Sequence, residues 1–281
     1  MVGRLISPKM SEVLGQQVLV DNRAGAGGSI GADIVAKAAP DGYTILVATG
    51  STHTMNPVLY KKIPYHPIRD FAPIGMVVVT PFILVTHKDT PATDLKSFVE
   101  LVKKNPGKYN YGSSGVGSNL HLCTEQLKQL TGMTDLTHVP YRGSGPLLND
   151  LTSGQLGLAL DAIATSTPHI QAGTFRPLGA ATIKRLRTMP DLPTLDEQGA
   201  KGFDCYTWNG LCAPAKTPEP IIKRLNEALN AVLADKAITG RMMDMGFDPM
   251  TSSTPRQLAD FTQSELDRWT PIIKATGVEL D

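Results

Sequence analysis

The middle of the chain repeats one pattern three times: a short β-rich run, a turn that carries glycine or serine, and a helical stretch. Parallel strands need a crossover of a dozen or more residues, and a helix is the usual crossover. The alternation therefore predicts an α/β fold with mainly parallel sheets. The predicted strands are Lys108–Tyr111, Leu136–Val139, Leu156–Leu160 and a closing Arg176–Thr182, and the predicted helices are Ser118–Leu130, Pro146–Thr152 and Thr167–Ala172.

The residues before this repeat show the same alternation with more interruptions. Pro40 ends one predicted helix, and the segment Pro57–Pro73 holds four prolines, which predicts an irregular path over the surface. The predicted elements are a helix at Leu5–Leu14, a strand at Gln17–Val20, a helix at Gly28–Ala39, a strand at Tyr43–Ala48, a long β-branched stretch at Ile74–Val85 and a helix at Asp94–Lys104.

The last part of the chain changes to three predicted helices. Two of them, Pro218–Leu233 and Pro255–Thr276, carry apolar residues at helical spacing and a proline near the first turn. The apolar stretches Val77–Thr86 and Phe203–Pro214 predict two crossings between lobes. We therefore expect a first lobe at 1–79, a second at 80–207, and a mainly helical return to the first lobe at 208–281.

The charge of the chain is nearly balanced, with 27 Lys and Arg against 26 Asp and Glu and a formal net charge of +1. Nucleic-acid binding depends on a basic surface, so this balance removes its main electrostatic argument. A nearly neutral protein that binds an anion must hold it with local groups rather than with a global field.

Cysteine and histidine do not form a metal-binding pattern. The three cysteines, Cys123, Cys205 and Cys212, lack ligand spacing, and none of the six histidines forms an i, i+4 pair. Cys205 and Cys212 pair if the intervening segment folds back, or both remain buried thiols, and the sequence leaves both outcomes open. We predict no metal site and no cofactor.

No apolar run approaches the ~18 residues that a membrane-spanning helix needs. No signal peptide is visible, because an amphipathic helix follows almost directly after Met1. The chain is therefore expected to begin either at a true cytoplasmic start or partway into a longer protein.

The most informative segment is a glycine- and serine-rich loop at Tyr111–His121, between a predicted strand and a predicted helix. Its glycines let a backbone approach a ligand closely, and Ser114 or Ser118 can cap the helix. Exposed N–H groups at a helix start favour a carboxylate or a phosphate. The same residues also suit a capped turn without a ligand. The loop matches neither a P-loop, nor a dinucleotide fingerprint, nor a nucleophile elbow.

Three further loops follow predicted strands, at the edge where ligands bind in open α/β sheets. They are Ala48–Pro57, Pro140–Pro146 and Asp161–Ser166. Arg142 could bind a carboxylate in bidentate fashion or be only a solvated charge. Asp161 could bind an amino group or only orient backbone donors. The cluster Asp21–Ser29 is similar in composition, but tight-turn chemistry accounts for it and favours a structural role.

Taken in order, these loops resemble the Bug/TctC family, the solute receptors of tripartite tricarboxylate transporters. The similarity covers essentially the whole chain. The matching stretches are VLGQQVLVDNRAGAGGSIGADIVAKAAPDGYTILVAT, DFAPIGMV, YGSSGVGSNLHL, VPYRGSGPLLNDLTSGQL, the run at 168–173 before Arg176, MPDLPTLDEQG and WNGLCAPAKTP. The resemblance implies a type II periplasmic-binding-protein-like α/β fold, in which two α/β lobes around a cleft are joined by two crossover segments.

The resemblance also implies a function without catalysis: a periplasmic receptor that captures a small carboxylate. The implied ligand is a di- or tricarboxylate, an aromatic acid or an acidic amino acid, and the implied partners are the membrane subunits of a tripartite transporter. The implied state is a monomer, with no nucleic acid bound. Carried over by position, the implied ligand contacts are Ser113, Ser114, Gly117, Ser118, Tyr141, Gly143 and Asp161 in the second lobe, and Ser51 and Thr52 in the first.

The chain departs from the family at its start. Family members begin with a signal peptide, a first strand and a Pro/Gly-rich loop that ends in Asp, before the helix that here starts near Val2. We expect a truncated version of a longer protein, because removal of a strand would expose hydrogen-bonding edges and apolar surface.

Two other functions stay open on the sequence. A serine hydrolase would use Ser114 or Ser118 beside a base such as His121, but nothing in the sequence selects a catalytic set. A ligand sensor would use the same cleft and signal to a partner. A transcription regulator of related fold is not expected, because no helix-turn-helix segment precedes the lobes.

Overall fold

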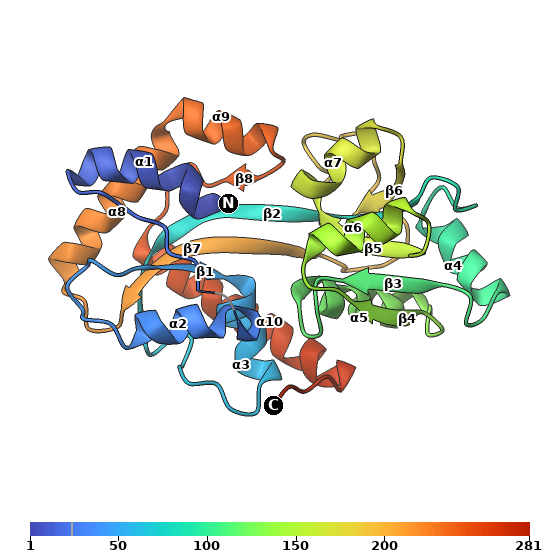
Figure 1. Ribbon diagram of the computed structural model, residues 1–281, viewed down its shortest axis with the longest axis horizontal. Helices are drawn as coiled ribbons and strands as arrows, with labels where there is room; N and C mark the ends of the chain where they lie inside the picture. Colours follow the sequence, from blue (N-terminus) through green and yellow to red (C-terminus); the bar gives the residue numbers. More distant parts are fainter. Residues whose placement is uncertain (24) are drawn as a thin grey trace. The chain divides into compact units, whose positions relative to one another are not determined.

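The computed structural model describes residues 1–23 and 25–281, which form two compact units. Unit 1 comprises Met1–Val79 and Thr207–Asp281, and unit 2 comprises Thr80–Tyr206. The chain enters unit 2 within strand β2 (Phe71–His87) and returns to unit 1 at the start of strand β7 (Tyr206–Pro214) (Figure 1). Unit 2 is therefore one continuous stretch of chain, whereas unit 1 is assembled from two.

The sheet of unit 1 places β7 between β1 (Leu46–Thr49) and β2. β1 and β7 run antiparallel, with Ala48 opposite Gly210, and the short β8 (Asp248–Pro249) pairs antiparallel with β2. The prediction of mainly parallel strands is wrong for these pairs. The reason is that β7 and β8 come from the returning part of the chain and not from successive strand-helix-strand repeats.

Helices cover the strands of unit 1 on two sides. They are α1 (Val2–Leu14), α2 (Ser29–Ala36), α3 (Asn56–Leu59), α8 (Glu219–Ala234), α9 (Lys236–Asp244) and α10 (Pro255–Thr276), with short helical turns at η1 (Ala26–Gly28) and η2 (Ser51–Met55). α8 packs against α1 (Figure 1), and α10 packs against η2. A Cβ at Gly75 of β2 or at Gly210 of β7 would come within 2.9 Å of Leu229 or Leu258 respectively, so these glycines let α8 and α10 approach the strands closely.

The predicted strand at Gln17–Val20 is wrong. These residues have no regular secondary structure, and the side chain of Leu19 is 76% exposed. The Val18 N–H donates to Ser11 Oγ at the end of α1 rather than to a neighbouring strand. A β-rich run becomes a strand only where another strand pairs with its backbone, and β1 pairs with β7 instead.

The glycine-rich cluster Asp21–Ser29 leads into α2 through left-handed backbone conformations. Gly27 and Gly28 have φ angles of 60° and 92°, which only glycine adopts without strain. The Asn56 side chain donates to the carbonyl of Gly27 and to Ser29 Oγ, at 3.1 and 2.9 Å. These contacts agree with the structural role expected for the cluster, of which Ala24 lies outside the described residues.

Unit 2 contains the predicted repeat, with its boundaries shifted by a few residues. Its strands are β3 (Asn110–Ser113), β4 (Thr137–Pro140), β5 (Leu158–Ala162) and β6 (Phe175–Ala180), and its helices are α4 (Leu95–Lys104), α5 (Asn119–Thr131), α6 (Ser144–Thr152) and α7 (Ile163–Gln171). β3 lies between β4 and β5 and runs parallel to both, which confirms parallel pairing for these three strands of the repeat but not for its closing strand β6. β2 and its neighbours β5 and β6 run antiparallel.

The core of unit 2 holds α6 against this sheet. Leu147 and Leu151 of α6 are fully buried and pack in one cluster with Ile83 of β2. A Cβ at Gly112 of β3 would lie 2.5 Å from Leu156, so glycine at this position allows the packing. The close packing fixes the end of β3, from which the glycine- and serine-rich loop begins.

A disulfide joins Cys123 of α5 to Cys205, which lies just before β7. The alternative of a Cys205–Cys212 pair is therefore wrong, and Cys212 is a buried free thiol. Burial raises the pKa of the Cys212 thiol to about 12, so this sulfur is an apolar core group and not a nucleophile. The disulfide could not be read from spacing, because its cysteines are 82 residues apart.

Candidate functional site

The candidate site of unit 2 lies at the carboxyl ends of β3, β4 and β5. Because these strands are parallel neighbours, the loops that follow them meet at the same edge of the sheet. The Tyr141 N–H donates to the carbonyl of Ser113 at 2.9 Å, and the Ser144 hydroxyl donates to Asp161 Oδ1 at 2.9 Å. The structure thus brings together the predicted residues of three loops. They are Ser113, Ser114, Gly117, Ser118, Tyr141, Gly143 and Asp161.

The loop between β3 and α5 is held by its own serines. Gly115 and Gly117 have φ angles of 138° and 75°, which glycine accommodates without a Cβ clash. Ser118 is the N-cap of α5, and its Oγ accepts from the His121 N–H at 3.3 Å. The Gly115 N–H donates to Ser113 Oγ at 3.2 Å. The start of α5 is therefore presented at the sheet edge, where its dipole favours an anion.

Ser113 makes the only hydroxyl–imidazole contact of this loop that the described residues show, with Oγ 2.7 Å from His138 Nε2. The distance is that of a nucleophile beside a base. However, the Ser113 side chain is fully buried, and its hydroxyl also donates to the carbonyl of Gly115 at 3.0 Å. The contact therefore stabilises the loop, and it does not involve Ser114 or Ser118, which were the predicted candidates for a hydrolase.

The loop between β4 and α6 contributes Tyr141 and Gly143. The Tyr141 hydroxyl donates to Asp150 Oδ2 at 2.7 Å, so its ring is fixed by a residue of α6. Burial and then the hydrogen bond to Asp150 raise the pKa of this hydroxyl to about 12. Gly143 is the N-cap of α6 with φ 99°. Arg142 is exposed, as expected for a solvated charge.

Asp161 is a fully buried carboxylate at the end of β5. Three hydroxyls donate to it: Ser144 to Oδ1 at 2.9 Å, and Thr165 and Ser166 to Oδ2 at 2.5 and 2.9 Å. Burial raises the pKa of Asp161, and the three hydroxyls oppose the rise. Since both oxygens are occupied by the starts of α6 and α7, the arrangement favours an orienting role for Asp161 over contact with an amino group.

Ser51 and Thr52 belong to unit 1 and follow β1 in the turn η2. Thr52 is only 4% exposed. Its Oγ1 accepts from the Thr49 N–H at 3.0 Å and lies 3.0 Å from His53 Nδ1, and its carbonyl accepts from the Tyr65 hydroxyl at 2.7 Å. Thr52 therefore closes the end of β1, whereas Ser51 is half-buried.

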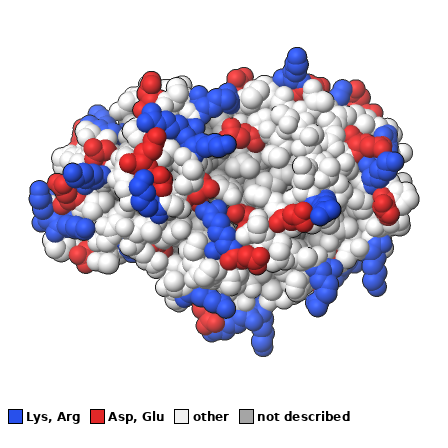
Figure 2. All heavy atoms as spheres, turned by 180° about the vertical axis from the view of Figure 1, so that it is seen from behind, with Lys and Arg blue, Asp and Glu red and all other residues white. Residues whose placement is uncertain are grey.

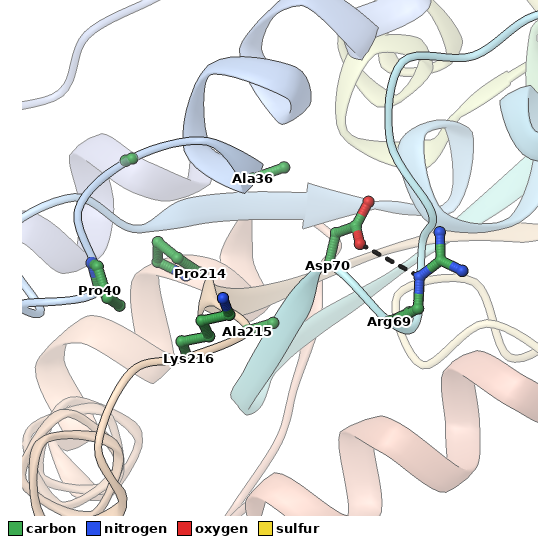
Figure 3. A pocket seen from close by; sticks show the side chains of 8 residues that line it. Ala36, Pro40, Arg69, Asp70, Pro214, Ala215 and Lys216 are labelled. Atoms are coloured by element: carbon green, nitrogen blue, oxygen red, sulfur yellow. Dashed lines mark ion pairs between the residues drawn. The ribbon is translucent and has the colours of Figure 1, made fainter.

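A separate pocket of about 360 Å³ lies in unit 1 (Figure 3). Arg69 and Lys216 supply its positive charges, and Asp70 pairs with Arg69 at 3.5 Å. None of the predicted ligand residues lines it. Its two positive charges are exposed and it already includes a carboxylate, so it lacks the desolvated donors of an anion site.

Charges of both signs are interspersed across the face of the molecule in Figure 2. This pattern agrees with the net charge of +1 and leaves anion binding to local donors. Within residues 1–23 and 25–281, no group of three or more His, Cys, Asp or Glu side chains is arranged to hold a metal ion. None of the described helices is both long and apolar enough to span a membrane.

Several residues of the site were not predicted from the sequence. Ser144, Thr165 and Ser166 hold Asp161, and His138 contacts Ser113. The hydroxyls lie in segments that were predicted as loops, so a search for hydroxyls one turn after a strand-end carboxylate could have found Thr165 and Ser166. His138 lies on β4 and reaches Ser113 only because β3 and β4 are neighbours. No local signal in the sequence shows that pairing.

Comparison with known proteins gives one consistent answer. The family model described as "Tripartite tricarboxylate transporter family receptor" matches residues 2–278. The protein BugT of Bordetella pertussis is 34% identical over 280 residues, which cover 99% of this chain and 85% of BugT.

Three solved structures are similar over nearly the whole chain. Rpa4515 of R. palustris with adipate has 35% identity and a TM-score of 0.92, covering 99% of this chain and 93% of that one. The periplasmic binding protein BugD has 37% identity and a TM-score of 0.89, with the same coverage. MatC from Rhodopseudomonas palustris with bound malate has 35% identity and a TM-score of 0.87, covering 97% and 93%.

Proposed function

This chain belongs to the tripartite tricarboxylate transporter receptor family, and we propose that it captures a small organic carboxylate in the periplasm for a membrane transporter. Its fold is that of the type II periplasmic binding proteins of the Bug and TctC kind. Members of this family are solute receptors rather than enzymes. The finer points of ligand, residues and membrane partner are part of the proposal.

The observation that carries the proposal is the meeting of three strand-to-helix loops at one edge of the unit 2 sheet. The starts of α5 and α6 lie at this edge, and each supplies backbone N–H groups and a positive dipole end. Such groups hold a carboxylate without a neighbouring Lys or Arg. This mode of binding suits a protein whose net charge is +1.

We propose that Ser114, Gly117, Ser118, Tyr141 and Gly143 of unit 2 contact the ligand, with Ser113 and Asp161 fixing the loops from behind. Within unit 1, Ser51 remains a predicted contact, and the buried Thr52 fixes the end of β1. The burial of Ser113 and Asp161 and their full sets of hydrogen bonds support this division of roles.

The proposed ligand class is a di- or tricarboxylate, an aromatic acid or an acidic amino acid. Two similar structures contain adipate and malate, which supports a dicarboxylate among these. Both oxygens of Asp161 accept from hydroxyls, which leaves little capacity for a ligand ammonium and favours acids without an amino group.

The experiment is a ligand screen by thermal shift, followed by calorimetry, at about pH 8 so that the carboxylates are ionised. Malate, adipate, citrate, benzoate and glutamate represent the classes. Saturable binding of one of them with one site per chain is expected. No saturable binding to any of the five would contradict the proposal.

The transport role has a separate test. A strain that lacks this protein should lose uptake of the acid that binds best, and the intact gene should restore it. Unchanged uptake together with tight binding would instead favour a sensor, which captures the same ligand and signals to another partner.

A further inference from the structure

Two histidines lie stacked beneath the loop between β3 and α5. The rings of His121 on α5 and His138 on β4 have centroids 4.0 Å apart and planes within 10° of parallel. Tyr111 of β3 extends the stack, 4.9 Å from His138. His121 is only 5% exposed. The stack joins the helix and two strands whose ends build the candidate site.

His121 is bonded to two successive residues of the loop. Its Nδ1 accepts from the Gly117 N–H at 3.0 Å, and its own backbone N–H donates to Ser118 Oγ at 3.3 Å. Gly117 has a φ of 75°, so the imidazole holds the loop at a left-handed residue. An imidazole nitrogen accepts a hydrogen bond only while it carries no proton. The contact therefore requires a neutral His121 with its proton on Nε2.

The surroundings keep this imidazole neutral near pH 7. Burial lowers the pKa of His121, Lys128 lowers it further, and Glu125 acts in the opposite direction. Lys128 pairs with Glu125 at 2.8 Å, and the Tyr111 hydroxyl also donates to Glu125. The Glu125 carboxylate is thus shared between Lys128 and Tyr111. This sharing limits how far Glu125 raises the pKa of His121.

The second histidine responds differently to acid. Burial, with a contribution from His121, lowers the pKa of His138 to about 4. Its Nε2 faces Ser113 Oγ at 2.7 Å, and a hydroxyl oxygen can accept from an imidazole N–H. Protonation of His138 therefore keeps its contact to the loop, whereas protonation of His121 places an N–H against the Gly117 N–H.

We propose that His121 is a positioning residue whose neutral imidazole holds Gly117 and Ser118 in the conformation that binds a carboxylate, so that its protonation weakens binding. This inference rests on the function proposed above. The opposing effect is the added positive charge, which would attract an anion. The directional hydrogen bond outweighs it, because Lys128 already supplies a positive charge to the same cluster and its partner Glu125 screens both.

The test compares the wild type with His121→Asn, since the Asn oxygen takes the position of Nδ1, accepts from Gly117 and does not titrate. Dissociation constants for malate and adipate are measured at about pH 8 and about pH 5. Beyond the change in His121→Asn, the wild type should lose affinity at the lower pH, by up to about tenfold, which is the value of one hydrogen bond. His169→Asn, a change at another histidine of unit 2, should keep the wild-type profile.

A second readout does not depend on a ligand. In the free protein, the NMR shift of the Gly117 amide proton should follow the titration of His121, and it should stay constant in His121→Asn. A Gly117 amide that does not titrate in the wild type would overturn the inference, whatever the protein binds. Tighter binding of malate or adipate by the wild type at about pH 5 would overturn it too, since charge attraction would then dominate. Failure of both acids to bind at about pH 8 would instead count against a dicarboxylate as the ligand in the proposed function, and the pH comparison would then use the acid that binds best.

Discussion

Ser144, the first residue of α6, donates its hydroxyl to Asp161 at the end of β5, 2.9 Å away. With Thr165 and Ser166 at the start of α7, it surrounds a carboxylate that has no exposed surface. One buried side chain thus sets the positions of two helix starts at the candidate site.

Replacement of Asp161 should therefore affect stability and binding together. Asp161→Ala leaves three hydroxyls without their acceptor and should lower the free energy of unfolding by about 2–4 kcal/mol. Asp161→Asn keeps one acceptor oxygen and should cost less. Urea unfolding measures the stability of the two variants. The exposed Asp191 of the same unit offers a control, because Asp191→Ala should stay within about 0.5 kcal/mol of the wild type. Equal losses of the free energy of unfolding in Asp161→Ala and Asp191→Ala would show that the Asp161 carboxylate does not fix the starts of α6 and α7.

Replacement of the loop glycine Gly117 by alanine should weaken ligand binding more than backbone strain at a left-handed residue alone would. Gly117→Ala and Gly173→Ala each place a Cβ on a left-handed residue of unit 2, with φ angles of 75° and 69°. Each should lose about 1 kcal/mol of stability. Calorimetry with the acid that binds best should show at least about tenfold weaker binding for Gly117→Ala only. Equal affinities of the two variants would remove Gly117 from the site.

The disulfide should contribute measurably to stability. Cys123 and Cys205 close a loop of 82 residues, for which cross-linking of the unfolded chain is worth about 2–4 kcal/mol. The double variant Cys123→Ala/Cys205→Ala should melt at a lower temperature than the oxidised wild type. Dithiothreitol should lower the melting temperature of the wild type and leave the double variant unchanged. A thiol titration of the unfolded, unreduced wild type should find one free thiol, that of Cys212.

Acid should destabilise unit 1 through His53. This side chain is 2% exposed, and burial lowers the pKa of its imidazole from 6.5 to about 4. In the unfolded chain the group protonates near 6.5, so the unfolded state binds more protons than the folded state between pH 6.5 and 4. Stability is therefore complete above pH 6.5 and falls as the pH drops toward 4.

The expected loss at about pH 4.5 is about 2.5 kcal/mol. His53→Asn, which does not titrate, should show a smaller decrease of the free energy of unfolding between about pH 7.5 and about pH 4.5. The variant costs some stability at every pH, so the comparison concerns the slope and not the absolute value. Parallel slopes for the two proteins would contradict a buried neutral His53.

The sequence predicted those parts of the fold that depend on local pattern. The repeat of strands and helices from β3 to β6 is recovered, because apolar periodicity and turn residues such as Gly132 mark each element end. The strand at Gln17–Val20 failed for a physical reason: pairing is not local, and the segment finds no strand beside it among the described residues. The same reason explains the antiparallel pairs of β7 and β8.

The site was predictable as a set of loops but not as a set of contacts. Gly115 and Gly117 mark a loop that needs left-handed conformations, and this is visible in the sequence. The hydrogen bonds of Ser144 with Asp161 and of Ser113 with His138 join different strands, so they depend on the order of strands in the sheet. The disulfide partner of Cys205 depends on tertiary folding in the same way.

The two units differ in how the chain supplies them, and this gives them different entropic costs of folding. Unit 2 is one continuous stretch that ends at Tyr206 and contains both cysteines of its disulfide. Unit 1 also needs Thr207–Asp281, which bring β7 to the side of β1. The two stretches of unit 1 are joined through unit 2. Closing a long flexible loop costs entropy, so a folded unit 2 should lower the entropic cost of bringing these two stretches together. A substitution that destabilises the unit 2 core should therefore also slow the folding of the divided unit 1.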